Sequence, residues 1–270
     1  MVLDYQYFKI YFTIFLLWLG FQFPGIVTDF IAYFLILTLG VIHGANDLLV
    51  LKKHEKRRNS YIKSVIGYIG LICICISSFF LNPFISLLLF IIVSGYHFGE
   101  QHFENKIIAP KIYSYTVYLV YGLIIFGMIF LENRTEVDSI VNRLAKRSFP
   151  ENSVFIGSIA CSIILIFLLI LGILKNFKLK FNIYKEIFYL GLLYLVFRNT
   201  GLIFGFGVYF IFWHSIPSII DQTKYLSGAA DKKTLLNYFK SASPYWLLSI
   251  GGLLGLYSLM DEGYLTLQFF

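Results

Sequence analysis

The sequence predicts an all-α fold, a polytopic transmembrane helical bundle of about nine spans with its N-terminus in the cytoplasm. Three observations predict it. Of the 270 residues, 58% are hydrophobic and only 14% are charged, and the mean hydropathy is +0.75, whereas soluble domains carry about 25% charged residues. The chain divides into apolar runs close to the roughly 20 residues that a helix needs to cross a bilayer. The basic residues gather between these runs, in alternate connections.

The predicted spans are mostly joined by short connections, so we expect one integral membrane domain over residues 1–270. Turn-forming residues separate several of them, as at Pro24-Gly25 and Asn82-Pro83. The first apolar run begins near Tyr7 and lacks the cleavage pattern of a signal peptide, so we expect it to remain as the first helix. The predicted spans cover residues 7–23, 28–51, 61–81, 84–103, 112–131, 153–174, 184–199, 201–221 and 244–260.

Basic residues mark every second connection. They follow the second span in the cluster Lys52–Arg58, and further lysines follow the fourth, sixth and eighth spans. The connections after the first and third spans contain almost none. Because cytoplasmic loops carry the excess of Lys and Arg, this pattern places the N-terminus in the cytoplasm and the C-terminus outside. These loops account for the net charge of +7, which therefore does not indicate nucleic-acid binding.

The connection after the fifth span, residues 132–152, is long and carries apolar residues at helical spacing among its charges, including Val137, Ile140 and Val141. Two interpretations are open. The segment is either an amphipathic helix on the membrane surface or an ordinary solvated connector.

Histidines lie inside three of the predicted spans, where an ionisable side chain is costly and indicates function. His43, His97 and His214 occupy the second, fourth and eighth spans, which all run in the same direction across the membrane. Each lies about six to eight residues before the cytoplasmic end of its span, so at a rise of 1.5 Å per residue their depths agree within a few ångströms. We therefore expect the three imidazoles to meet at one level of the bundle.

Each of these histidines is followed by an acid on the same helix face, at spacings of four, three and seven residues. The acids are Asp47, Glu100 and Asp221. Neutral imidazole is a ligand for Fe, Zn, Cu or Ni, and a metal-bound histidine commonly donates its second N–H to a carboxylate. The pattern therefore favours a metal site with these acids behind the ligands.

Small residues beside the histidines, Gly44, Gly95 and Gly99, predict close helix approach. Pro217, three residues after His214, predicts a kink because it cannot donate a backbone hydrogen bond. A single histidine in a span often serves only as a hydrogen-bonding residue between helices. Three at one depth, each with an acid, instead favour a metal site or a proton-handling site.

The histidine stretches resemble the Brp/Blh family of bacterial and archaeal beta-carotene 15,15'-dioxygenases. The family motif His-Gly-Ala-x-Asp is met by residues 43–47, and Tyr-His-Phe-Gly by residues 96–99. A Tyr-Phe segment followed by Trp-His-Ser and Asp-Gln is met within residues 209–222. A Ser-x-x-Pro segment at residues 241–244 also matches, so the resemblance covers nearly the whole chain.

This resemblance implies that O₂ cleaves the central double bond of beta-carotene to give two retinal molecules, at iron, Fe(2+), held by histidines. His43, His97 and His214 match three of the four ligand positions of the family. The resemblance also implies a multi-pass protein in the lipid bilayer of the inner, cytoplasmic cell membrane. A functional link to a rhodopsin that uses the retinal follows from the same resemblance.

The fourth ligand position departs from the family, which has a histidine four residues after the third one. Here Ser218 stands in its place. His102 occupies a position where the second motif has its acid and is the tentative fourth ligand. It lies five residues after His97, about 140° around an ideal helix, so both reach one metal only if the helix distorts. The alternatives are three histidines completed by water or Glu100, or a branch with altered or lost activity.

Aromatic residues near the histidines are expected to line a path for the polyene and to stabilise cationic character on it. The nearest candidates are Tyr96, Phe98, Tyr209 and Trp213, for which plain packing is the alternative. Three other functions use the same residues: another iron-dependent membrane oxygenase, a proton-coupled transporter, and a haem protein with two histidine ligands. The histidine clusters HxxxH and HxxHH of membrane desaturases are absent from the sequence.

Overall fold

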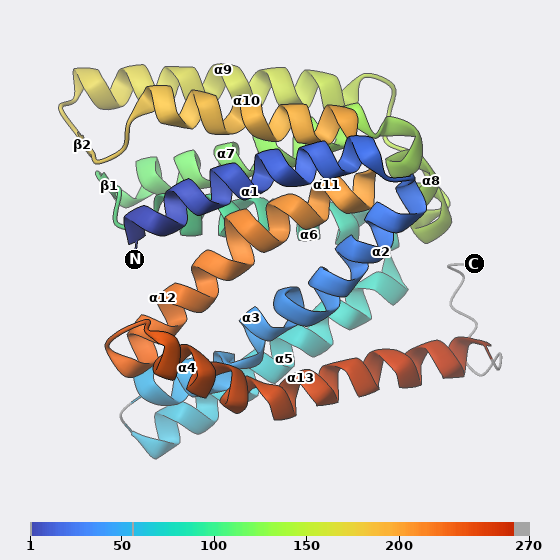
Figure 1. Cartoon of the computed structure of the whole chain (residues 1–270), viewed down its shortest axis with the longest axis vertical. Helices are drawn as coiled ribbons and strands as arrows, with labels where there is room; N and C mark the ends of the chain where they lie inside the picture. The colour runs from blue at the N-terminus through green and yellow to red at the C-terminus, as the bar shows by residue number, and fades with distance from the viewer. Residues whose placement is uncertain (1, 56, 262–270) are drawn as a thin grey trace.

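The structure of the protein is a computed structural model, which describes residues 2–55 and 57–261 as a bundle of helices (Figure 1). Two π-helical turns, η1 (Ile36–Gly40) and η2 (Tyr209–Ser215), each continue directly into α-helices on both sides. A short antiparallel pair joins β1 (Ile107–Ile108) to β2 (Lys178–Leu179). The α-helices are α1 (Val2–Gln22), α2 (Gly25–Leu35), α3 (Val41–Ala45), α4 (Asp47–His54), α5 (Arg58–Leu81), α6 (Pro83–Phe103), α7 (Lys111–Glu132), α8 (Arg134–Ala145), α9 (Ser153–Leu174), α10 (Ile183–Asn199), α11 (Leu202–Val208), α12 (Ile216–Ser227) and α13 (Lys232–Asp261).

The predicted helical membrane bundle is confirmed, since every predicted span lies on helical segments of the structure. Six helical stretches of the described chain are long and apolar enough to cross a membrane. The other three predicted spans fall on α1, α10 and α13, so the count of nine and the side of the N-terminus stay predictions. The six stretches are Gly25–His54, Arg58–Leu81, Pro83–Phe103, Lys111–Glu132, Ser153–Leu174 and Leu202–Ser227.

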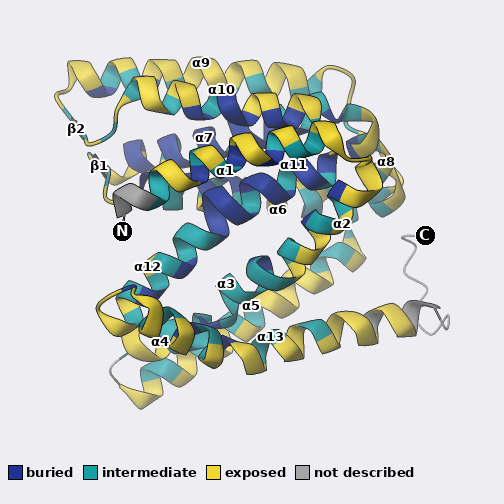
Figure 2. Cartoon of the chain, viewed as in Figure 1, coloured by how far each residue is buried: buried dark blue, intermediate teal, exposed yellow. Residues whose placement is uncertain are grey.

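The core of the bundle lies on α7, α11 and η2, while α5, α9 and α13 expose most of their side chains (Figure 2). α7 buries residues on nearly every turn, among them Val117, Tyr121 and Ile125. By contrast, α5 has no buried residue and α9 has only Leu168 and Gly172. Apolar helices that leave their side chains uncovered are suited to a lipid environment rather than to water.

Helices α6 and α7 cross at glycines, which brings their backbones into contact. A Cβ atom on Gly99 would lie 1.9 Å from the Tyr118 carbonyl oxygen, and one on Gly122 would lie 1.8 Å from the Gly95 carbonyl oxygen. The predicted close approach at Gly95 and Gly99 is therefore confirmed. The same prediction for Gly44 is wrong, because only Asp47, from its own segment, comes within 4 Å of a Cβ placed there. The crossing fixes α6 at the level of His97.

The long connection after α7 forms helix α8, whose apolar stripe faces the protein. Val137 and Val141 are buried, and α8 packs against α6 and α7. Glu136 accepts a hydrogen bond from the Leu202 amide at 3.1 Å and so caps the start of α11. The stripe therefore belongs to the bundle, and α8 closes the end where α11 begins (Figure 1).

We expect Gly122→Ala to destabilise the protein by about 1–3 kcal/mol, because the added methyl group overlaps the α6 backbone, which cannot move aside as a side chain can. The matched control is Gly157→Ala in α9, where nothing lies within 4 Å of the new Cβ. Thermal unfolding of both variants in detergent measures the difference. Equal melting temperatures would contradict the close crossing.

Candidate metal centre

The structure brings His43 of α3, His97 of α6 and His214 of η2 together. The ring centroids of His43 and His214 are 5.1 Å apart, and those of His97 and His214 are 5.0 Å apart. Both pairs are close to perpendicular, at 82° and 76°. His214 lies between the other two and is only 1% exposed. The three imidazoles therefore share one level of the bundle, as their matched depths in the sequence predict.

The wide turn η2 and Pro217 together position His214. Pro217 has no backbone N–H, so a carbonyl of the preceding turn loses its usual donor. The Tyr5 hydroxyl donates to the Phe212 carbonyl at 2.5 Å, and Gln101 Nε2 donates to the His214 carbonyl at 2.9 Å. Side chains from α1 and α6 thus donate to two carbonyls of the π-helical turn. The irregularity that the structure shows just before Pro217 is this turn, and the predicted kink at Pro217 stays a prediction.

His43 is held by a hydrogen bond between its Nδ1 atom and the Gly40 carbonyl oxygen. A carbonyl oxygen only accepts, so Nδ1 carries the proton and Nε2 keeps its lone pair. Metal-binding histidines commonly donate their second ring N–H to a backbone carbonyl in this way. Gly40 ends the π-helical turn η1, so the same helix irregularity that precedes His43 also fixes its tautomer.

His214 has no hydrogen-bond partner for either ring nitrogen among the described residues, although both nitrogens are buried. A buried polar atom without a partner costs about 1–3 kcal/mol, and an absent ion is one recognised explanation. Two imidazoles bound to one metal at about 2.0–2.1 Å have ring centres roughly 5 Å apart in tetrahedral geometry. The two observed separations agree with that value, and neutral imidazoles are ligands that suit a transition-metal ion.

Within the described residues, no group of three or more His, Cys, Asp or Glu side chains is placed so that it could hold a metal ion without rearrangement. The case for a metal at the histidines therefore rests on ring separation, on the protonation of His43 and on the unpartnered nitrogens of His214.

Phenylalanine rings pack against the histidines. Phe210 stacks on His214 and meets His43 edge-on, with its centroid 5.5 Å from each ring. Phe98, one of the predicted lining residues, lies 4.6 Å from His214, and Tyr209 packs behind it at 5.4 Å. Sequence reasoning missed Phe210, although its position four residues before His214 puts both side chains on neighbouring turns.

The other two predicted lining residues point elsewhere. The Tyr96 hydroxyl donates to Glu100 at 2.9 Å, and its ring packs on Tyr115 of α7. The Trp213 indole donates to Thr13 of α1 at 3.0 Å. Neither side chain is brought to the histidine rings by the contacts that the structure gives it.

The acids predicted to stand behind the histidines make other contacts, and no hydrogen bond in the described structure joins one of them to a histidine ring of the cluster. Two of the acids, Glu100 and Asp221, line a cavity of about 450 Å³ together with His97 and Ser218, and Asp47 does not line it. The neighbours of these residues are Tyr68 for Asp47, Tyr96 for Glu100, Lys224 for Asp221 and Gln222 for Ser218.

His102 is not brought to the other three histidines. Its Nε2 atom lies 2.7 Å from Glu186 of α10, and its ring stacks on Tyr121 of α7 with centroids 4.8 Å apart. Helix α6 continues without a break to Phe103, so the angular separation from His97 expected of an ideal helix is kept.

A hydrogen-bond network centred on Tyr238 of α13 contacts the backbone of His43. The Tyr238 hydroxyl faces the His43 carbonyl oxygen at 3.1 Å and Gln222 Oε1 at 2.8 Å. Asn46, which is fully buried where α3 ends, donates to the Tyr238 carbonyl at 3.1 Å and accepts from Ser241 at 3.1 Å. Sequence reasoning did not select these residues, although Asn46, Gln222 and Ser241 lie inside the motif stretches.

Comparison with known proteins identifies a family. A profile of the family described as beta-carotene 15,15'-dioxygenase matches residues 34–268, which include all three converging histidines. No curated protein and no solved structure matches the chain.

We expect Tyr238→Phe to destabilise the protein by about 1 kcal/mol, because the single hydroxyl hydrogen shared by the His43 carbonyl oxygen and Gln222 Oε1, both part-buried, is lost. Tyr257→Phe on the same helix is the control, since Tyr257 is 68% exposed and surface changes cost at most about 0.5 kcal/mol. Unfolding of the purified proteins in detergent measures both. A Tyr238→Phe protein as stable as the control would contradict the network.

Proposed function

The chain belongs to the beta-carotene 15,15'-dioxygenase family, and we propose that it cleaves the central double bond of beta-carotene with O₂ to give two molecules of retinal. One O₂ supplies both aldehyde oxygens, so hydrocarbon and O₂ are converted to two aldehydes without another reactant. The observation that carries the proposal is the meeting of three imidazoles inside an apolar bundle, with both nitrogens of His214 buried and unpartnered.

The proposed cofactor is Fe(2+), held by His43, His97 and His214. Bound iron would supply the one-electron chemistry that lets O₂ react with a carbon–carbon double bond. The protonated Nδ1 of His43 supports ligation through Nε2. The cavity beside His97 has room for water or the Glu100 carboxylate as a further ligand, in place of the imidazole that Ser218 does not provide. The pairing of His102 with Glu186 argues against His102 in that role.

The proposed binding path for beta-carotene runs from the bilayer along the phenylalanines. Phe206 stacks on Phe210 at 5.2 Å with the rings nearly parallel, and Phe210 stacks in turn on His214. Phe206 also lines an apolar cavity of about 300 Å³ between α6, α7, α8 and α11. A hydrocarbon ring in this cavity would have its conjugated chain directed at the histidines, where aromatic faces stabilise positive charge on it.

The proposed topology has nine spans in the inner, cytoplasmic cell membrane, with the N-terminus in the cytoplasm. The start of α1, the β1–β2 pair and the turn between α12 and α13 lie at one end of the helices in Figure 1, and α8 lies at the other. The lysine-containing connections meet at the first end, which is the distribution expected of a cytoplasmic face.

A second candidate function follows from Ser218, because the resembled family has a histidine at this position. The protein would then either cleave a different carotenoid in the same way or lack cleavage activity. If the protein is active, its aldehyde product would serve a retinal-binding protein such as a rhodopsin. A haem protein or a proton-coupled transporter built on the same cluster predicts no aldehyde at all.

In a bacterial host that accumulates beta-carotene, we expect coexpression to bleach the pigment and produce retinal, measured by chromatography. Alanine at His43, His97 or His214 is expected to lower retinal by more than about 100-fold, because each removes a proposed ligand. His54→Ala is the matched control, since His54 is exposed at the end of α4 and its loss should leave retinal unchanged.

Retinal produced at the normal level by all three alanine variants would overturn the catalytic role of the histidines. Unchanged carotene with iron-loaded protein would favour another carotenoid, and unchanged carotene with iron-free protein would favour lost activity.

Iron content tests the ligands separately from turnover. We expect purified protein to hold about one iron per chain, His214→Ala to lose it, and His102→Ala to keep it because Glu186 already engages that ring. Ser218→His adds an imidazole in the cavity beside His97 and is expected to slow the loss of iron to a chelator. Metal analysis after dialysis measures all four proteins. Iron lost from His102→Ala but kept by His214→Ala would contradict the proposed ligand set.

A further inference from the structure

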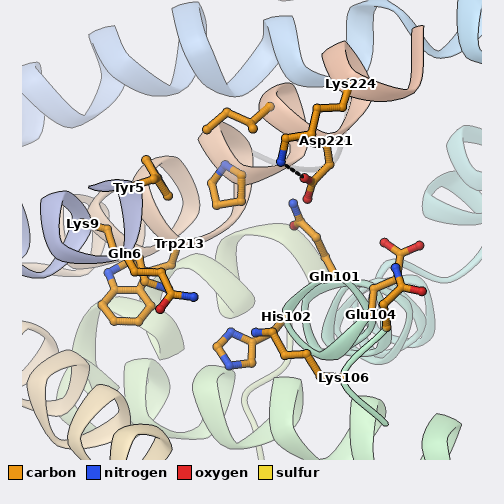
Figure 3. A pocket seen from close by; sticks show the side chains of 13 residues that line it. Tyr5, Gln6, Lys9, Gln101, His102, Glu104, Lys106, Trp213, Asp221 and Lys224 are labelled. Atoms are coloured by element: carbon orange, nitrogen blue, oxygen red, sulfur yellow. Dashed lines mark hydrogen bonds and ion pairs between the residues drawn. The ribbon is translucent and has the colours of Figure 1, made fainter. Parts of the chain in front are cut away.

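A third cavity, of about 450 Å³, lies near the end of the bundle where the lysine-containing connections meet. Its walls come from the start of α1, the end of α6, η2 and α12 (Figure 3). The lining is polar and charged with one large aromatic face, in contrast to the apolar cavity near Phe206. The residues that matter below are Lys9, Gln101, Glu104, Trp213 and Asp221.

Lys9 is the unusual member of this lining, because its charged side chain is buried and Glu186, an acid close enough to attract it, forms its ion pair with His102 instead. It is 8% exposed, and its Nζ atom lies 4.2 Å from the Trp213 ring centroid and 4.8 Å from that of Tyr189. No hydrogen bond or ion pair of Nζ joins it to another described residue, and the nearby Glu186 is engaged by His102. A buried ammonium group normally has a partner. Three N–H donors are therefore available to a ligand in the cavity.

The cavity adjoins the histidine site. Trp213 directly precedes His214, and Gln101 donates to the His214 carbonyl while its own Oε1 atom is buried without a partner. Gln101, Glu104 and Asp221 line both this cavity and the one beside His97. The two cavities therefore share part of one wall, and Lys9 lies on the wall of this one.

The chemistry of the lining selects among the molecules that the proposed reaction involves. Beta-carotene is a hydrocarbon and offers no acceptor to an ammonium group. A carboxylate would meet two acids, Glu104 and Asp221, on the cavity wall. A neutral carbonyl oxygen on an apolar chain matches both features, since the oxygen accepts from Lys9 and the chain packs on the Trp213 face.

We propose that this cavity binds the aldehyde end of a retinal-class polyene, the product of cleavage, with Lys9 donating a hydrogen bond to the carbonyl oxygen. The proposal rests on the proposed function, because only cleavage creates the acceptor that the cavity recognises. It makes Lys9 a product-binding residue on a route that the hydrocarbon substrate does not use.

The test is a titration of the purified full-length protein in detergent with all-trans-retinal, followed by quenching of tryptophan fluorescence. Lys9→Met is expected to weaken retinal binding about 10-fold or more, the effect of losing a charged hydrogen bond. Lys224→Met is the control from the same cavity and should change binding less than about twofold, because Lys224 is already paired with Asp221 at 3.4 Å.

A second measurement needs no variant and stands even if Lys9→Met fails to fold. The unmodified protein should bind retinal at least about 10-fold more tightly than the corresponding hydrocarbon that lacks the oxygen. Equal affinities for the two ligands, or retinal binding unaffected in a folded Lys9→Met protein, would overturn the proposal.

Because the titration uses added retinal, it is independent of turnover. Coexpression that yields retinal together with Lys9-independent binding would refute the cavity alone, whereas Lys9-dependent binding without carotene cleavage would refute the reaction alone.

Discussion

The central constraint on this structure is that imidazole nitrogens without hydrogen-bond partners are energetically costly inside an apolar bundle. His214 is the extreme case, fully enclosed by Phe98, Phe210 and two other histidines. Such a ring is tolerated only if its surroundings are rigid and if something binds the nitrogens. The backbone around it is accordingly secured by hydrogen bonds from two different helices, α1 and α6. Rigidity at this point would help to hold the proposed ligands in place.

Irregular helix geometry and close helix packing combine to bring the rings together. The π-helical turns η1 and η2 lie beside one another in the bundle, and each precedes or contains a histidine of the cluster. The glycine crossing of α6 and α7 fixes the third histidine from the opposite side. The cluster also separates two unlike cavities, an apolar one near Phe206 and a polar one at Lys9. This asymmetry suits a reaction whose substrate is a hydrocarbon and whose product carries oxygen.

Much of this arrangement was predictable, and the failures have identifiable causes. Span boundaries and histidine depth follow from hydrophobic length and the fixed rise of a helix, which do not depend on neighbouring helices. Gly44 was assigned to a close approach on local sequence alone, but no atom of another described helix lies within 4 Å of a Cβ placed there. The Tyr238 network was missed because its hydrogen bonds span more than 190 residues, a separation that no local spacing rule detects.

The sequence by itself determined a helical membrane bundle, the family to which the chain belongs, and the three histidines that lie at one depth, because composition, motifs and helical rise are local properties. Only the tertiary structure decided which side chains meet across helices. It assigned His102 to Glu186, directed the Gly40 carbonyl to His43, and put Lys9 over Trp213 beside a cavity. The physical reason is that helix rotation and crossing are set by packing between surfaces far apart in the chain, and these choose a side chain's partners among all those at its depth.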